Sequence, residues 1–156
     1  MYVLAESTTG RLEAANSVLK DNLKTWLNRY RMINDTIDIL DAKVANIGIE
    51  FEVVSDGTNR FDVLDEATST LQAKFNRDFF IGERLKITDI YTALNSARGV
   101  SDVTKVKIVT KSGGRYAQTG FNVDSQISAD GRYIAVPDNV ALEIKFPGTD
   151  IRGSVK

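Results

Sequence analysis

The chain has 156 residues, with 20 Lys and Arg against 21 Asp and Glu, for a formal net charge of −1. Charge this balanced argues against a nucleic-acid surface, which needs a basic patch or stripe, and against attraction to anionic membranes. Cysteine and histidine are both absent, which excludes disulfides, thiolate or imidazole metal ligation and histidine-dependent triads. We therefore expect no enzyme activity, no metal, no organic cofactor, and no nucleic-acid or membrane partner.

The N-terminal part is predicted to be an arm followed by a helix. Residues 1–15 show no sustained periodicity, and a Ser-Thr-Thr-Gly turn interrupts them. A helix is predicted from Asn16–Ser17, either of which can cap it. Its apolar residues recur at helical spacing: Leu19, Leu23, Trp26, Leu27 and Tyr30. We expect Trp26 and Tyr30 to pack in the core, the alternative being a ligand or partner site.

The central element of the prediction is a strand over Val44–Val54. Apolar side chains alternate along it with Gly48, Glu50 and Glu52, as in a strand with one buried face: Ile47, Ile49, Phe51 and Val53. Burial of such side chains contributes roughly 1.5–3 kcal/mol each, so the four can seed a core. A short strand around Ile37 and Ile39 is expected before it.

Two helices are predicted after this strand. Residues 60–77 carry an apolar stripe formed by Phe61, Leu64, Ala67, Leu71 and Phe75. Three carboxylates in its first turns, Asp62, Asp65 and Glu66, could suggest an acid–base pair. The helix dipole explains them without chemistry, and we favour that interpretation. A third helix over about 89–98 buries Ile90 and Leu94 and ends at Gly99, a left-handed C-cap.

The remaining third alternates strands with a long loop. A strand over Val103–Val109 is predicted to place Lys105 and Lys107 on one face, across from Glu50 and Glu52. Residues 111–129 lack a pattern and are predicted to form a long loop. A hairpin of strands over residues 132–136 and 140–146 is expected next, and 148–156 is predicted to be a polar tail.

The long loop holds our candidate interface residues, Arg115, Tyr116 and Phe121. Aromatic side chains and arginine are enriched at interface hot spots, and these rings have no local periodic core to join. We favour a docking arm that is ordered by a partner chain. In the alternative, the rings fold back over an open edge of the sheet and protect it.

From Trp26 to Ile33, at Asp35, Ile37 and Ile39, and from Val44 to Val54, the chain resembles baseplate J-like proteins. The likeness is to the carboxy-terminal region of the T-even-type phage baseplate wedge protein of that family. The likeness continues through a helix like the one predicted over Val63–Phe75 and an apolar-Gly element at Phe80–Gly82. It then includes a helix that ends at Gly99–Val100. The order and spacing match from about residue 16 to residue 109.

The resemblance implies a structural part of a contractile injection machine, located in the tail baseplate of the virion and assembled in the host cytoplasm. Its partners would be copies of itself, in a dimer or ring, and neighbouring baseplate wedge proteins. Family members are usually longer, so we expect residues 1–156 to be one domain, the last part of a longer wedge protein. The resemblance carries over no catalytic residues.

We predict an α+β fold with two layers, in which three helices cover one face of a mixed sheet of four or five strands. The leading functional hypothesis is a non-enzymatic assembly domain. The alternative is a small-molecule-binding or carboxylate-using enzyme domain, which would need acidic residues converging in one deep pocket.

Overall fold

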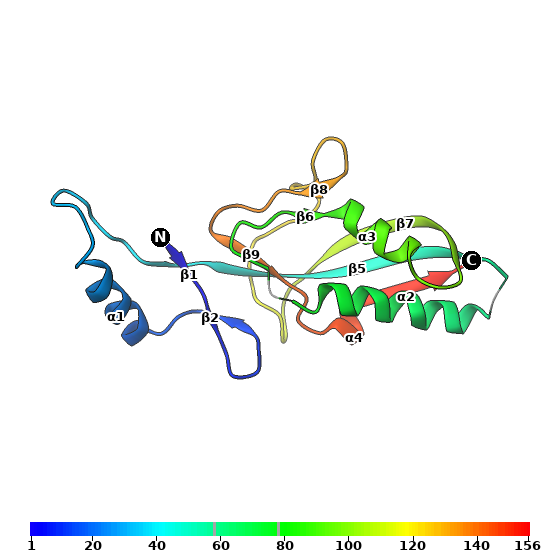
Figure 1. Ribbon diagram of the computed structural model, residues 1–156, viewed down its shortest axis with the longest axis horizontal. Helices are drawn as coiled ribbons and strands as arrows, with labels where there is room; N and C mark the ends of the chain where they lie inside the picture. The colour runs from blue at the N-terminus through cyan, green and yellow to red at the C-terminus, as the bar shows by residue number, and fades with distance from the viewer. Residues whose placement is uncertain (58, 78) are drawn as a thin grey trace.

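The chain adopts the predicted α+β class, with helices and mixed sheets (Figure 1). A computed structural model describes residues 1–57, 59–77 and 79–156. Within these residues the helices are α1 (Ser17–Leu27), α2 (Arg60–Phe75), α3 (Ile87–Asn95) and α4 (Pro147–Asp150). The strands are β1 (Tyr2–Val3), β2 (Ala5–Glu6), β3 (Leu12–Glu13), β4 (Leu40–Asp41), β5 (Lys43–Ser55), β6 (Leu85–Lys86), β7 (Val100–Lys111), β8 (Tyr133–Ile134), β9 (Val140–Glu143) and β10 (Ile151–Val155).

The main sheet is built around β5, the longest strand. On one edge β5 pairs antiparallel with β7, and the register sets Glu50 opposite Lys107 and Glu52 opposite Lys105, which confirms that prediction. On the other edge two parallel strands follow one another. β9 pairs with the first part of β5 and β10 with its later part, and the short helix α4 connects the two.

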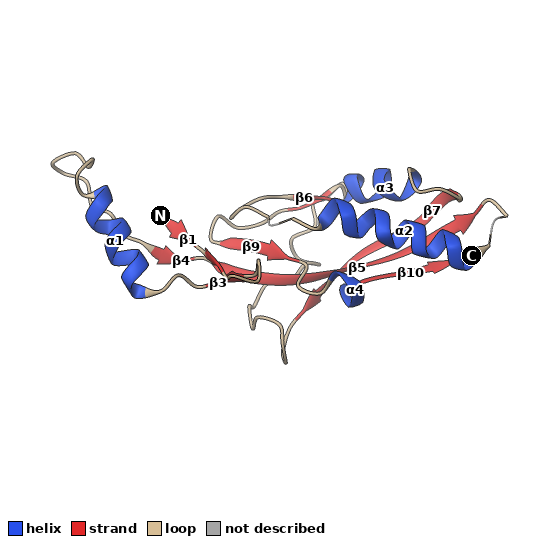
Figure 2. Cartoon of the chain, turned by 60° about the horizontal axis from the view of Figure 1, so that its bottom comes forward, coloured by secondary structure: helices blue, strands red, loops and turns tan. Residues whose placement is uncertain are grey.

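One face of this sheet carries the hydrophobic core. Ile47, Ile49, Phe51 and Val53 are buried, with exposed fractions of 0, 0, 3 and 0%. Helix α2 packs beside β10 and α3 beside β7 (Figure 2). The helices bury Val63, Ala67, Leu71 and Phe75 from α2, and Ile90, Ala93 and Leu94 from α3. The predicted core pattern of β5 and these two helices is therefore confirmed, except that Phe61 is 77% exposed and Leu64 is half-buried.

The C-terminal part differs from the prediction. Residues 148–156 are not a polar tail, because Ile151–Val155 form β10 and Ile151 is buried in the core. Gly153 lies opposite Phe51 and leaves room for its ring. The predicted hairpin is also wrong: β8 pairs with β6, while β9 pairs with β5. Each strand finds a distant partner, which local periodicity cannot reveal.

The N-terminal region stands apart from the two helices on the sheet. Helix α1 has no buried residue and lies at one end of the long axis of the molecule (Figures 1 and 2). The main sheet is thus covered by α2 and α3 but not by α1. Residues Ile37 and Ile39, predicted to be a strand, lie outside regular structure, just before β4, which pairs in parallel with β1.

Candidate functional site

The most unusual surface of the protein is the apolar side of α1 and the turn after it. We call it the apolar arm surface, and its exposed side chains are Val18 (66%), Leu19 (50%), Trp26 (54%), Tyr30 (71%), Met32 (77%) and Ile33 (99%). The prediction that Trp26 and Tyr30 pack in the core is wrong. Their rings contact each other, with centroids 4.8 Å apart, and the body of the protein does not cover them.

Polar contacts hold helix α1 and the segments beside it to one another. Asn16 caps α1 by accepting a hydrogen bond from the backbone N–H of Leu19 at 2.7 Å. Lys20 forms an ion pair with Asp41 at 2.8 Å, and the terminal amino group donates to the carbonyl of Asp38 at 2.8 Å. A helix as short as α1 is marginal in water without tertiary packing of its apolar face. Leu23 and Leu27 are half-buried, whereas the side chains of the apolar arm surface lack the burial that normally stabilises such a helix.

The N-terminal segment before α1 joins the main sheet through a buried polar cluster. Asn46 on β5 is 1% exposed and donates from Nδ2 to Oε2 of Glu143 at 2.6 Å. The other carboxylate oxygen of Glu143 accepts from the N–H of Leu12 at 3.2 Å. Oδ1 of Asn46 accepts from the N–H of Ala117 at 2.7 Å. One amide and one carboxylate thus bind the N-terminal segment, the sheet and the long loop together.

The long loop folds back onto the domain and is bonded to β5 through Val44 and Asn46. Phe121 is 8% exposed and belongs to the core, so it cannot act as a docking residue in this conformation. Tyr116 donates its hydroxyl to Asp150 at 2.5 Å, and this hydrogen bond is the main cause of a raised pKa for Tyr116. Arg115 stays exposed, with its guanidinium 4.3 Å from the centre of the Phe146 ring.

No local pattern of residues indicates this arrangement, because the loop is anchored by single polar contacts. The hydroxyl of Thr119 donates to the carbonyl of Val44, and the N–H of Val123 donates to the hydroxyl of Thr110. The prediction from the sequence therefore assigns Arg115, Tyr116 and Phe121 to one interface. The structure brings Arg115 and Tyr116 together beside Phe146, and it places Phe121 in the core.

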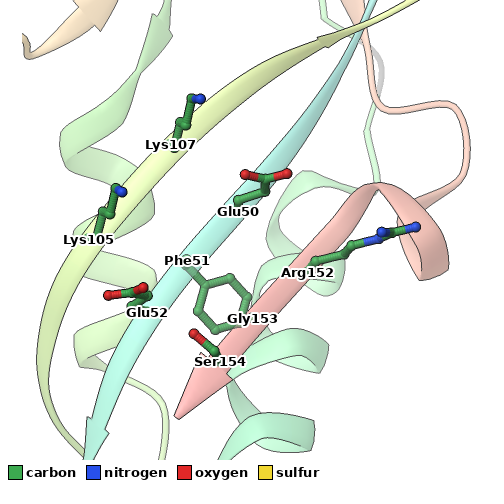
Figure 3. A pocket seen from close by; sticks show the side chains of 8 residues that line it. All are labelled: Glu50, Phe51, Glu52, Lys105, Lys107, Arg152, Gly153 and Ser154. Carbon is green, nitrogen blue, oxygen red and sulfur yellow. The ribbon is translucent and has the colours of Figure 1, made fainter. Parts of the chain in front are cut away.

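A second candidate surface is the side of the main sheet that faces away from α2 and α3. We call it the open sheet face, and it presents Glu50, Glu52, Lys105, Lys107, Arg152 and Ser154 around a shallow hollow of about 240 Å³ (Figure 3). Lys156 binds Glu52 at 2.9 Å and lowers the pKa of that carboxyl through this hydrogen bond. The remaining charges make this a solvated, predominantly basic surface.

A third feature lies where β5 leads into α2. We call it the acidic hollow, a depression of about 510 Å³ lined by Asp56, Asp62, Val63, Glu66, Arg98 and Gly99. Phe61, the neighbour of Asp62, is 77% exposed. The first turns of α2 thus combine carboxylates with one large apolar side chain that the protein itself does not bury.

The chemical capacity of these surfaces is limited. A hollow of about 420 Å³ between the β2–β3 hairpin and the end of α2 contains two carboxylates, Glu6 and Glu143. Glu143 is held by Asn46 and Leu12, which leaves it poorly placed for proton transfer.

Among residues 1–57, 59–77 and 79–156, no three acidic residues are grouped as metal ligands. The same part of the chain contains no helix with the length and apolarity to span a membrane.

Comparison with known proteins gives no family assignment, because no family model matches the chain and no curated protein matches it.

Proposed function

We propose that this chain is a non-enzymatic assembly component of a contractile phage tail baseplate wedge. It would contact copies of itself and neighbouring wedge proteins in the tail baseplate of the virion. The resemblance of residues 16–109 to baseplate J-like proteins suggests that the chain is part of a tail baseplate. The observation that carries the proposal is the apolar arm surface, on a projecting helix that has no buried residue.

Exposed apolar surface of this kind supports an interaction role on physical grounds. Contiguous apolar patches on soluble proteins commonly mark protein–protein contacts. Burial contributes roughly 25 cal/mol for each Å² of apolar surface removed from water, so a partner that covers the stripe would stabilise both the contact and the helix. Trp, Tyr and Met, all present here, are enriched at such interfaces.

The enzyme alternative has less support. Its strongest feature is the hollow that holds Glu6 and Glu143. An acid–base pair requires carboxylates that are free to exchange protons with a substrate. Because both oxygens of Glu143 accept hydrogen bonds within the protein, a structural role explains this buried residue.

The chain contains its own probe for a test. Trp26 is the only tryptophan, so fluorescence excited selectively at tryptophan reports on α1 alone. We expect water-like emission in dilute solution, and a blue shift with a rising sedimentation coefficient as the protein is concentrated. Leu19→Asp should abolish both changes, because it places a charge in the apolar arm surface. Asn28→Asp adds the same charge at the end of α1, outside the stripe, and is the matched control.

If the emission of Trp26 is already blue-shifted in the dilute monomer, the arm is covered by the body of the protein and the proposal loses its main support. If Leu19→Asp and Asn28→Asp assemble equally well, the apolar arm surface is not the contact.

A further inference from the structure

One exposed side of helix α1 carries no charged residue. Successive residues of an α-helix are rotated by about 100°, because one turn holds 3.6 residues. This rotation places five exposed side chains on one side, which we call the α1 face: Val18, Leu19, Asn22, Thr25 and Trp26. The three charged residues of the helix, Lys20, Asp21 and Lys24, fall on the opposite side. A partner that covers the α1 face therefore meets apolar groups, one hydroxyl and one amide.

The charges of the segment that surrounds α1 cancel. Residues 16–41 contain four cations and four carboxylates: Lys20, Lys24, Arg29, Arg31, Asp21, Asp35, Asp38 and Asp41. One ion pair, between Lys20 and Asp41, is formed within the molecule. Like net charges repel at an interface, but this segment has no net charge. A second copy of the same segment is therefore not repelled, and neither an acidic nor a basic partner is favoured over it.

The centre of the α1 face is complementary to itself. Asn22 lies midway along the face between Val18 and Trp26, and its side chain is exposed. An asparagine amide has both donors and an acceptor, so two such amides can bond to each other. A two-fold contact brings its central residue against the same residue of the second copy. In helix pairs, one asparagine in an apolar contact is a known means of fixing register and the number of helices.

The position of α1 lets two copies meet. The helix lies at one end of the long axis, whereas α2 and α3 lie over the main sheet (Figures 1 and 2). Two molecules can therefore join at this end while their sheets stay apart.

We infer that the α1 face of one copy packs against the α1 face of a second copy, about a two-fold axis that passes close to Asn22. The inference rests on the proposed function and specifies its self-contact. Leu19 and Trp26 supply the apolar area on either side of the axis, and the two Asn22 amides bond at its centre. Because the contact uses the α1 faces of both copies, it closes as a dimer.

Disulfide cross-linking tests the contact, since the chain has no cysteine of its own. Packed helices lie about 8–10 Å apart with Cα atoms about 2.3 Å from each axis, so facing Cα atoms are roughly 4–6 Å apart. A disulfide spans about 4.4–6.8 Å between Cα atoms. Asn22→Cys should therefore become mostly a covalent dimer after mild oxidation, at a concentration at which the wild-type chain associates.

Asn28→Cys is the matched control, because it makes the same exchange at the exposed end of α1, rotated by about 120° from Asn22. It should stay largely monomeric on the same non-reducing gel. Equal cross-linking of the two variants, or none in Asn22→Cys, overturns the inference.

Sedimentation velocity provides a second test without a covalent link. The wild-type chain should reach a dimer and go no further, and Asn22→Asp should weaken the dimer by about tenfold or more, because it sets two like charges at the axis. Asn28→Asp should leave the dimer unchanged, and circular dichroism melts should show each variant folded. A wild-type chain that stays monomeric, oligomers that keep growing with concentration, or an unaffected Asn22→Asp dimer each overturn the inference.

Failure of the inference can be told from failure of the proposed function. If Leu19→Asp abolishes association while Asn22→Cys does not cross-link, the apolar arm surface is still the contact, but it meets a surface other than a second α1. That result overturns the two-fold contact and leaves the proposed function standing. A blue-shifted Trp26 emission in the dilute monomer instead removes the support for both.

Discussion

Substitution of Gly153 by alanine should destabilise the protein, because this glycine leaves space for an aromatic ring. Gly153 lies opposite Phe51 in the parallel pair of β10 and β5. A Cβ atom added there would overlap the tip of the Phe51 ring and would lie 2.8 Å from Cδ1 of Leu64. Overpacking of a core costs about 1–3 kcal/mol. Alanine loses less backbone entropy than glycine, which offsets about 0.4–1 kcal/mol.

We therefore expect a net loss of roughly 1–2 kcal/mol in the free energy of unfolding, or a few degrees in Tm for a domain of this size. Urea denaturation followed by circular dichroism measures the loss, since Trp26 reports only on the arm. Gly148→Ala is the matched control: a Cβ there has no atom within 4 Å, so stability should stay constant or rise. Phe51→Leu in the Gly153→Ala background should relieve the overlap. A Gly153→Ala protein as stable as the wild type would refute the proposed packing of Phe51.

The same unfolding measurements test three further substitutions. Phe51→Ala should cost about 3–5 kcal/mol, because it opens a cavity beneath the helices; an unchanged melt would remove β5 from the centre of the core. Asn46→Ala should cost about 1–3 kcal/mol, since it leaves the buried carboxylate of Glu143 without its amide donor; full stability would mean that water replaces the amide. The pKa of Tyr116 is raised chiefly by its hydrogen bond to Asp150, so this contact stabilises below about pH 10 and is lost at higher pH. Tyr116→Phe should therefore reduce the alkaline loss of stability, and an unchanged pH profile would contradict this.

The elements that could be predicted from the sequence are those whose own residues define a buried face. The alternation along β5 identified a buried strand, and the register then placed Lys105 and Lys107 opposite its two glutamates. The stripes of α2 and α3 likewise matched buried faces, apart from the exposed Phe61 and the half-buried Leu64 of α2. In these cases the local pattern and the tertiary packing agree.

The elements that were mispredicted depend on distant partners. β10 contains Arg152, Gly153 and Ser154, a polar sequence whose role as a strand depends on pairing with β5. The stripe of α1 was identified correctly, but a periodic pattern does not tell whether the covering surface belongs to the same chain. Trp26 was therefore assigned to the core, although it is 54% exposed. The apolar stripe could be predicted from the sequence, whereas the structure was needed to show that the stripe is exposed.

The two parallel strands on one edge of β5 have a consequence for how the protein is made. β5, α2, α3 and β7 all precede β9 and β10 in the chain, so they are synthesised first. The opposite edge of β5 stays unpaired until β9 and β10 have been synthesised, and closing such long-range pairs is slow. An apolar strand with an open edge is prone to pair with other chains. Pairing of β10, from Ile151 to Val155, therefore protects the nascent protein from aggregation as well as completing its sheet.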